Sequence, residues 1–190
     1  MSYLKMAAIT AVAIFLFLQF GCEKKEARTA APNENTQAAM PSPDPASAGA
    51  IKWMGFTDGI NQSKKTGRPV MIDFYTTWCK YCKLLDDTTY KDPGVAQTVN
   101  GSFIAIKVNA EGENKVTYEG VSMTERDLAS KFGVTGFPSI WFLDGKQQKI
   151  GQVPGYESAQ DFKPKLTYIS SGAYAKGIKF EDYLKSVGGK

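Results

Sequence analysis

Short apolar runs alternate with amphipathic stretches from about residue 51 to the end of the chain. Apolar runs flanked by Gly, Pro, Asn or Asp are typical of buried strands, whereas apolar residues three and four positions apart are typical of helices. The runs predict strands at residues 70–75, 103–109, 139–143 and about 148–153. The amphipathic stretches predict helices at residues 58–66, 79–90, a short one ending near 100, 124–132, 158–170 and 180–186.

Capping residues predict where several of these helices begin and end. Asp58 is expected to cap the first helix, and Gly67 is expected to end it. Thr124 is followed three positions later by Asp127, which predicts a capping box at the start of a helix. The Asp144-Gly145 pair predicts the turn of a hairpin between the last two strands.

The order of the predicted elements indicates the fold class. Residues 110–122 are polar and contain glycine, so a loop or an insertion is expected there. The remaining order is helix, strand, helix, strand, helix, strand, strand, helix. This order predicts an α/β fold in which a mixed central sheet is covered by helices on both faces.

The N-terminal segment has a different pattern from the rest of the chain. A single charge at Lys5 precedes an uncharged, mainly apolar run at residues 6–20. These features are typical of the two leading regions of a secretory signal, and the run is short for a membrane span. A signal peptide is therefore expected over residues 1–21.

The end of this apolar run resembles the lipobox of bacterial lipoproteins, because a small Gly21 precedes Cys22. The resemblance implies that Cys22 is acylated and becomes the mature N-terminus. Gln19 and Phe20 depart from the residues that the lipoprotein pattern prefers. An uncleaved anchor, or a cleaved signal that leaves Cys22 free, are the alternatives. All three interpretations place the following domain outside the cytoplasm.

Residues 23–50 are rich in Ala, Pro, Ser, Asn and Thr and contain almost no large apolar residues. Such a segment cannot bury enough apolar surface to offset the entropy of folding. It is expected to be a disordered linker with a root-mean-square reach of roughly 30 Å. The folded domain is expected to span residues 51–190.

Composition excludes several classes of function. The chain has 190 residues, 3 cysteines, no histidine and a formal net charge of +4. Without histidine it has neither Ser-His nor Cys-His nucleophilic catalysis, and no histidine-ligated metal. The charges are mixed along the chain, so binding to nucleic acid is not expected. The cysteines are too few for a scaffold stapled by disulfides.

Cys79 and Cys82 lie between a predicted buried strand and a predicted helix, in the run Trp78-Cys79-Lys80-Tyr81-Cys82-Lys83. A helix N-terminus has unpaired N–H groups and a partial positive charge, which favour a thiolate. A cysteine three positions later lies on the same face and can resolve a mixed disulfide. The alternatives are a structural disulfide between the two cysteines, or a zinc ion that both of them bind. Zinc takes four ligands, however, and Cys22 is the only other cysteine in the chain. No metal and no cofactor are expected.

Four separated motifs resemble the thioredoxin family, and together they cover nearly all of residues 51–170. They are residues 70–83 with the two cysteines, Asp92-Pro93-Gly94-Val95, residues 132–139 with their proline, and residues 151–156. The chain is most similar to periplasmic members of the family, of the DsbD C-terminal-domain type and the SoxW type. The resemblance implies a thioredoxin-like fold and thiol–disulfide exchange.

The resemblance implies a catalytic role for each of four residues. Cys79 resembles the attacking cysteine, and Cys82 resembles the more buried resolving cysteine with which it forms the redox disulfide. Asp73 resembles the buried aspartate that helps the resolving cysteine lose its proton, and desolvation should raise its pKa; a solvated strand residue is the alternative. Lys107 resembles the lysine near that aspartate, and an edge-exposed lysine is the alternative.

Five further residues are expected to bind substrate. Trp78 resembles the aromatic residue that flanks the site, with ordinary packing as its alternative. Pro138 resembles the cis-proline that faces the disulfide and frees the backbone of Phe137 to pair with an extended substrate chain; a trans proline at a strand start is the alternative. Lys80 and Tyr81 replace the Gly-Pro of cytosolic thioredoxin, and Lys80 adds positive charge that favours the thiolate.

The sequence therefore predicts an exported, lipid-anchored thiol–disulfide oxidoreductase of the cell envelope or periplasm. The expected direction is reduction of disulfides in exported proteins, with a membrane reductant transporter as electron donor. An oxidase or isomerase of the same fold is one alternative. A non-catalytic lipoprotein that binds a thiol or copper is another, because soft thiolates suit Cu(I).

Overall fold

The computed structural model describes residues 49–188. The predicted signal peptide, Cys22 and residues 23–48 of the predicted linker lie outside the described residues. No helix among residues 49–188 combines the length and apolar character needed to cross a bilayer.

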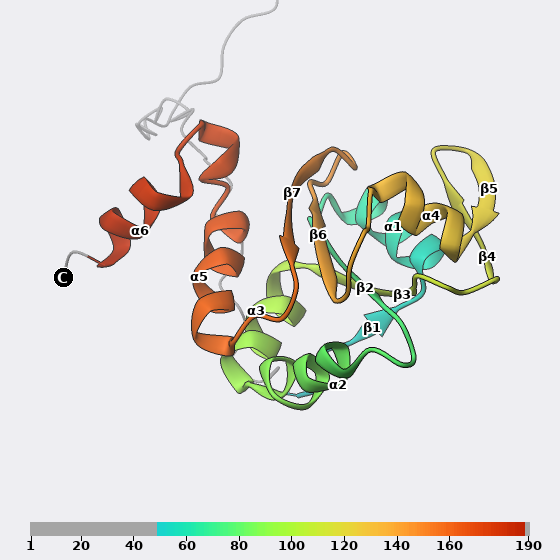
Figure 1. Cartoon of the computed structure of the whole chain (residues 1–190). Helices are drawn as coiled ribbons and strands as arrows, with labels where there is room; N and C mark the ends of the chain where they lie inside the picture. Colours follow the sequence, from blue (N-terminus) through green and yellow to red (C-terminus); the bar gives the residue numbers. More distant parts are fainter. Residues whose placement is uncertain (1–48, 189–190) are drawn as a thin grey trace, which may run out of the picture. The chain divides into compact units, whose positions relative to one another are not determined.

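A mixed sheet of five strands forms the centre of the described domain, in the order β1-β3-β2-β6-β7 (Figure 1). Strands β1, β3 and β2 run parallel, whereas β6 is antiparallel to β2 and β7 is antiparallel to β6. The sheet confirms the predicted fold class. The strands are β1 Trp53–Met54, β2 Val70–Tyr75, β3 Ile104–Asn109, β6 Ser139–Leu143 and β7 Lys149–Pro154.

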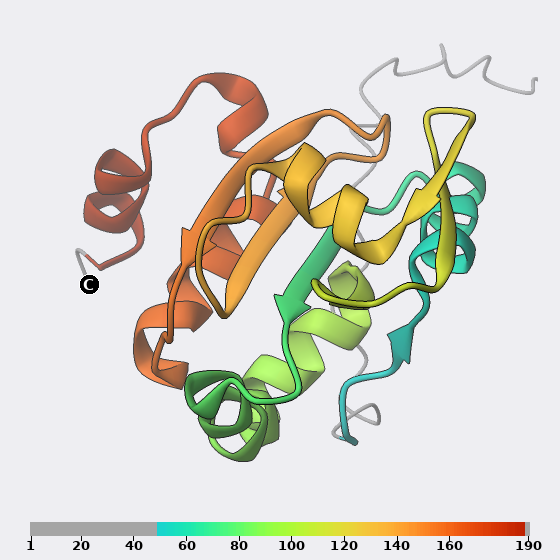
Figure 2. The ribbon, with the colours of Figure 1, turned by 45° about the vertical axis from the view of Figure 1, so that its right-hand side comes forward.

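Helices cover both faces of this sheet (Figure 2). The helices α1 and α4 pack on one face, and α3 and α5 pack on the other. The α-helices are α1 Phe56–Thr66, α2 Lys80–Asp87, α3 Pro93–Ser102, α4 Glu125–Phe132, α5 Ala159–Ser170 and α6 Phe180–Gly188. Two short 3₁₀ helices are η2 Thr89–Lys91 and η3 Tyr174–Lys176.

Strand β2 is buried on both faces, which explains why its sequence is almost entirely apolar. Ile72 and Phe74 belong to the core cluster beneath α1 and α4. Met71 belongs to the cluster beneath α3 and α5. Because side chains alternate along a strand, Asp73 lies on the same face as Met71. A carboxyl group is therefore placed inside the core beneath α3 and α5.

The prediction of a loop at residues 110–122 is wrong. This part of the chain contains an antiparallel hairpin made of β4 Lys115–Tyr118 and β5 Val121–Thr124. Val116 and Tyr118 are buried in the cluster with α1 and α4, while their neighbours are exposed. Glu119 and Gly120 both have positive φ, as a two-residue hairpin turn requires. The alternation of apolar and polar residues in this segment was too short to predict the strands, and its Glu-Gly turn is not one of the typical hairpin sequences.

Two helix boundaries also differ from the prediction. Helix α1 begins before Asp58, so Asp58 lies in its first turn. The N-cap residue is Gly55, which has no side chain to cap the helix. Helix α2 ends at Asp87 instead of continuing to Tyr90, which lies in the separate 3₁₀ helix η2. The predicted end of α1 at Gly67 is confirmed by its left-handed φ of 71°. Strand β1 was not predicted, because two residues are too few to show a pattern.

Thr124 and Asp127 form the predicted capping box at the start of α4. The Thr124 hydroxyl accepts from the Asp127 N–H at 3.0 Å, and the Asp127 carboxylate accepts from the Thr124 N–H at 3.1 Å. Two N–H groups that would otherwise lack a partner are thus satisfied.

We expect Thr124→Ala to lower the free energy of unfolding by about 1 kcal/mol, because it removes this cap. Urea denaturation of the disulfide-bonded protein measures the change. Ser122→Ala, at an exposed position on the neighbouring strand, is the matched control and should change stability little. Equal stability of the two variants would contradict the capping role.

Candidate functional site

Cys79 and Cys82 form a disulfide at the start of α2, as predicted. Cys79 is the N-cap residue of this helix, and the backbone N–H of Cys82 donates to its sulfur at 3.1 Å. Strand β2 ends at Tyr75, so the chain passes directly from the buried strand to the disulfide. When the disulfide is reduced, the same N–H group and the helix N-terminus favour a thiolate at Cys79.

A surface pocket reaches Cys79 at the start of α2. Both cysteines are largely buried, with 4% of Cys79 and 3% of Cys82 exposed. The pocket has a volume of about 400 Å³ and lies between the start of α2 and the loop before β6. Its lining consists of Trp78, Cys79, Lys80, Tyr81, Thr135, Gly136 and Phe137. An incoming sulfur therefore meets Cys79 first, and Cys82 lies behind it.

Aromatic side chains surround this pocket. Trp78 is 64% exposed and Tyr81 is 59% exposed, so neither ring lies in the core. The Trp78 ring meets Phe137 edge to face, with 6.0 Å between the ring centroids. The Trp78 indole N–H donates to the Glu111 carboxylate at 2.9 Å. These contacts fix the indole as one wall of the pocket.

The Phe137–Pro138 peptide bond is cis, as the family resemblance implied, so the alternative of a trans proline is wrong. Pro138 directly precedes β6, and its carbonyl accepts from the Gly155 N–H at 2.8 Å. Phe137 lines the pocket at Cys79. The structure thus brings the cis-proline loop and the start of α2 together around one opening.

Asp73 is buried with 1% of its surface exposed, so the alternative of a solvated strand residue is wrong. Its partner across the β2–β3 pair is Lys107, whose Nζ lies 3.9 Å from the Asp73 Oδ2. The Lys107 ammonium also forms an ion pair with Asp86 on α2. Lys107 lies on β3, one residue beyond the part of this strand that pairs with β1, and its side chain is 22% exposed.

Burial raises the pKa of Asp73 to about 7, because desolvation disfavours the charged carboxylate. The Lys107 ammonium opposes this effect and lowers the pKa. The Asp86 carboxylate raises the pKa further, and the Tyr90 hydroxyl lowers it. The result is a buried carboxyl group that exchanges its proton near neutral pH.

Asp86 and Glu111 are residues of this site that were not predicted from the sequence. Asp86 is four positions after Cys82 on α2, so the two share a helix face. That spacing was the signal that could have identified it. Glu111 follows the end of β3, and the ends of the parallel strands β2 and β3 lie at the same edge of the sheet. The sequence signal for Glu111 was weaker, because its contact with Trp78 depends on the path of a loop.

The loop that carries Glu111 is fixed to the start of α4. The buried Glu125 carboxylate accepts from the Asn114 side-chain amide at 3.0 Å. The Arg126 guanidinium donates to the Glu111 carbonyl at 3.2 Å and forms an ion pair with Glu113 at 2.7 Å. The Glu111 carboxylate is thereby held beside Trp78.

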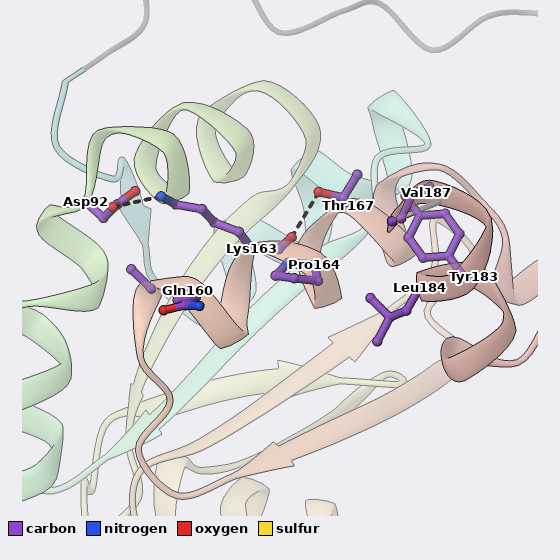
Figure 3. Close-up of a pocket in the computed structure, with 10 residues that line it drawn as sticks. Asp92, Gln160, Lys163, Pro164, Thr167, Tyr183, Leu184 and Val187 are labelled. Atoms are coloured by element: carbon purple, nitrogen blue, oxygen red, sulfur yellow. Dashed lines mark hydrogen bonds and ion pairs between the residues drawn. The ribbon is translucent and has the colours of Figure 1, made fainter. Parts of the chain in front are cut away.

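A larger cavity, of about 800 Å³, lies between α5 and α6 (Figure 3). It contains an ion pair of 2.9 Å between Lys163 and Asp92, together with apolar side chains such as Leu184 and Val187. None of the predicted site residues lines it. Within residues 49–188 the structure brings together no three His, Cys, Asp or Glu side chains that are able to hold a metal.

Comparisons with known proteins agree with this geometry. A family profile described as a thioredoxin-like domain matches residues 56–170. A "Thiol:disulfide interchange protein DsbD" of Salmonella paratyphi A is 32% identical over 129 residues, which are 63% of this chain and 21% of that protein. A DsbD of Ralstonia nicotianae is 31% identical over 63% of this chain and 18% of its own length. The chain thus spans about a fifth of these relatives.

Solved structures show the same fold. A thioredoxin from Thermus thermophilus superposes with a TM-score of 0.56 and 24% identity, over 68% of this chain and 94% of that chain. A thioredoxin-fold protein from Helicobacter pylori superposes with a TM-score of 0.54 and 22% identity, over 65% and 81% of the two chains. The chain therefore belongs to the thioredoxin-like family.

Proposed function

We propose that this protein is an exported reductase of protein disulfides. The observation that carries the proposal is the pocket at Cys79, with Cys82 bonded behind it at the start of α2. In the reduced protein the Cys79 thiolate attacks a substrate disulfide, forms a mixed disulfide and releases one substrate thiolate. Cys82 then attacks the Cys79 sulfur and releases the second substrate thiolate. Two electrons pass to the substrate, and the Cys79–Cys82 disulfide re-forms.

Asp73 takes the proton of Cys82 in the second step of this proposal. Its support is a buried carboxyl group whose pKa of about 7 allows it to accept a proton at neutral pH. Lys107 links it to Asp86, which lies one helical turn after Cys82. The ammonium compensates part of the negative charge that forms when Asp73 ionises.

The substrate meets a mainly aromatic surface in this proposal. Trp78, Tyr81 and Phe137 contact its side chains, and Lys80 places a positive charge beside the reactive sulfur. The backbone at Phe137 and Pro138 pairs with an extended segment of the substrate, as a strand added to an edge does. Such pairing suits many sequences, because every polypeptide offers the same main-chain groups.

We propose a location in the bacterial cell envelope, with a signal peptide at residues 1–21, an acylated Cys22 and a linker at residues 23–50. The support is the sequence pattern, together with relatives named thiol:disulfide interchange proteins. In the same proposal a membrane reductant transporter returns the disulfide to the dithiol. An isomerase is the second candidate, because a "Protein disulfide-isomerase tigA" of Aspergillus niger is also 32% identical over 62% of this chain.

We expect Cys79→Ser to abolish reduction of a model disulfide such as insulin, because it removes the attacking sulfur. Cys82→Ser should instead accumulate mixed disulfides, because Cys79 still attacks and nothing resolves the product. Non-reducing gels of the variants purified from the cell envelope measure the adducts. The double variant is the control, and adducts there, or their absence in Cys82→Ser, would contradict the two-step exchange.

We expect the reduction potential of the Cys79–Cys82 pair to lie between those of thioredoxin and DsbA, about −270 and −120 mV, and nearer the first. Lys80 raises the potential by stabilising the thiolate. Equilibration in glutathione buffers measures it, with Lys83→Gln as the control for Lys80→Gln. A value at the DsbA end would support an oxidase instead.

We expect Asp73→Asn to slow the Cys82-dependent release step at neutral pH, because an amide cannot accept the proton. The rate in the unmodified protein should rise with pH through about 7, where Asp73 ionises, and the variant should lack that rise. Stopped-flow decay of a preformed mixed disulfide measures this step. Identical pH profiles would contradict the proton role.

The Asp73→Asn variant should also be more stable than the unmodified protein above pH 7. The pKa of Asp73 is near 3.8 when unfolded and about 7 when folded, so folding binds a proton between these values and stability falls as the pH rises through them. Replacing Asp73 by Asn removes this loss, which is roughly 2–4 kcal/mol at pH 8. At pH 4 the two proteins should differ little.

A further inference from the structure

The two oxygens of the Asp73 carboxyl group have different surroundings. Oδ2 lies 3.9 Å from the Lys107 ammonium. Oδ1 is buried and has no hydrogen-bond partner of normal geometry within the described part of the chain. An ionised carboxylate with one oxygen unpartnered in the core is unfavourable, so ionisation near pH 7 calls for a donor on this side.

The Tyr90 hydroxyl is the matching group. Tyr90 is 5% exposed, and its hydroxyl is buried without a hydrogen-bond partner among residues 49–188. Its ring is fixed edge to face against Trp53, at 5.0 Å between centroids, and against Phe162, at 6.4 Å. The ring centroid also lies 5.9 Å from the Lys107 Nζ. The ring that carries this buried donor therefore lies near the same ammonium that faces Asp73.

We propose that Tyr90 is a positioning residue for Asp73, whose Oδ1 accepts a hydrogen bond from the Tyr90 hydroxyl when the carboxylate forms. This inference rests on the proposed function, in which Asp73 receives the proton of Cys82. The hydroxyl stabilises the charged form more than the neutral form, so it lowers the pH at which Asp73 becomes a proton acceptor. Neither group then remains unpartnered in the core at the moment when the negative charge appears.

The charged and titratable groups around Asp73 agree with this role. Lys107 on β3 lowers its pKa, Asp86 on α2 raises it, and Tyr90 on η2 lowers it. The single Lys107 ammonium is shared between the Asp73 and Asp86 carboxylates, so it does not fully compensate both negative charges. A neutral hydrogen-bond donor provides part of the missing stabilisation. Burial and the neighbouring Asp73 and Asp86 carboxylates raise the pKa of Tyr90 well above its usual value. Tyr90 therefore keeps its proton and remains a donor over the whole working range of pH.

Tyr90→Phe tests the proposal, because it removes the hydroxyl and keeps the ring. We expect the pKa of Asp73 to rise by roughly half to one unit, as expected for the loss of one hydrogen bond to the charged form. Titration of the Asp73 carboxyl carbon by NMR in the disulfide-bonded protein measures this without any turnover. An unchanged Asp73 titration would overturn the proposal.

Tyr118→Phe is the matched control, because Tyr118 is also buried but belongs to the cluster on the opposite face of the sheet. It should leave the Asp73 titration unchanged, and an equal shift would overturn the proposal. In the unmodified protein the Tyr90 ring carbon next to the hydroxyl should titrate with a midpoint of about 7, and Asp73→Asn should abolish this. Absence of that titration would also count against the proposal, even if Tyr90→Phe did not fold.

Turnover separates this inference from the proposed function. If Asp73 accepts the proton of Cys82, the pH profile of the release step in Tyr90→Phe should move upward by the same amount as the Asp73 pKa. If the pKa moves and the release step does not, the contact between Tyr90 and Asp73 is supported, and the role of Asp73 in release fails. Tyr90→Phe in an Asp73→Asn background should have no effect on the release step.

Discussion

Ionisation of a carboxyl group inside the sheet is the interaction on which the site depends. Asp73 lies on a strand buried on both faces, where desolvation makes its negative charge unfavourable. The neighbouring strand supplies one ammonium, Lys107, which also pairs with Asp86 on the helix that carries Cys82. The protein thus keeps in its core a group that lowers stability at neutral pH. Such a cost is typical of functional sites, where burial moves a pKa to the value that proton transfer needs.

The same strand also delivers the disulfide to the surface. Because β2 is the central strand, its path is fixed by β3 on one side and β6 on the other. The chain leaves it at Tyr75 and reaches Cys79, the N-cap of α2, only four residues later. One rigid element therefore fixes the position of the Asp73 carboxyl group in the core and that of the Cys79 sulfur at the opening. The cis-proline loop enters β6, which pairs directly with β2, so the second wall of the pocket is held by the same sheet.

The sequence predicted the parts of this arrangement that depend on local patterns. Residues 70–75 form the predicted strand, because a continuous apolar run is sufficient evidence for a strand buried on both faces. The β4–β5 hairpin was missed, because its burial depends on α1 and α4, which are distant in the sequence. Asp86, Tyr90 and Glu111 were missed for a related reason. Each acts through a partner on another element, and a single sequence does not reveal such pairings unless their spacing on one helix is recognised.

The surface around Cys79 bears on how substrates are selected. Its walls are Trp78, Tyr81 and Phe137, and the Glu111 carboxylate beside it already binds the Trp78 indole. A hydrogen bond that is already made inside the protein contributes little to recognition of a partner, so Glu111 fixes a wall more than it selects a charge. Lys80 is the one charged side chain in the pocket lining, and it lies next to the sulfur that must become negative. Electrostatics at this opening therefore serve the thiolate. In the proposed function, selection of partners is left to aromatic contact and main-chain pairing, which discriminate weakly between sequences and would suit a reductase with more than one protein substrate.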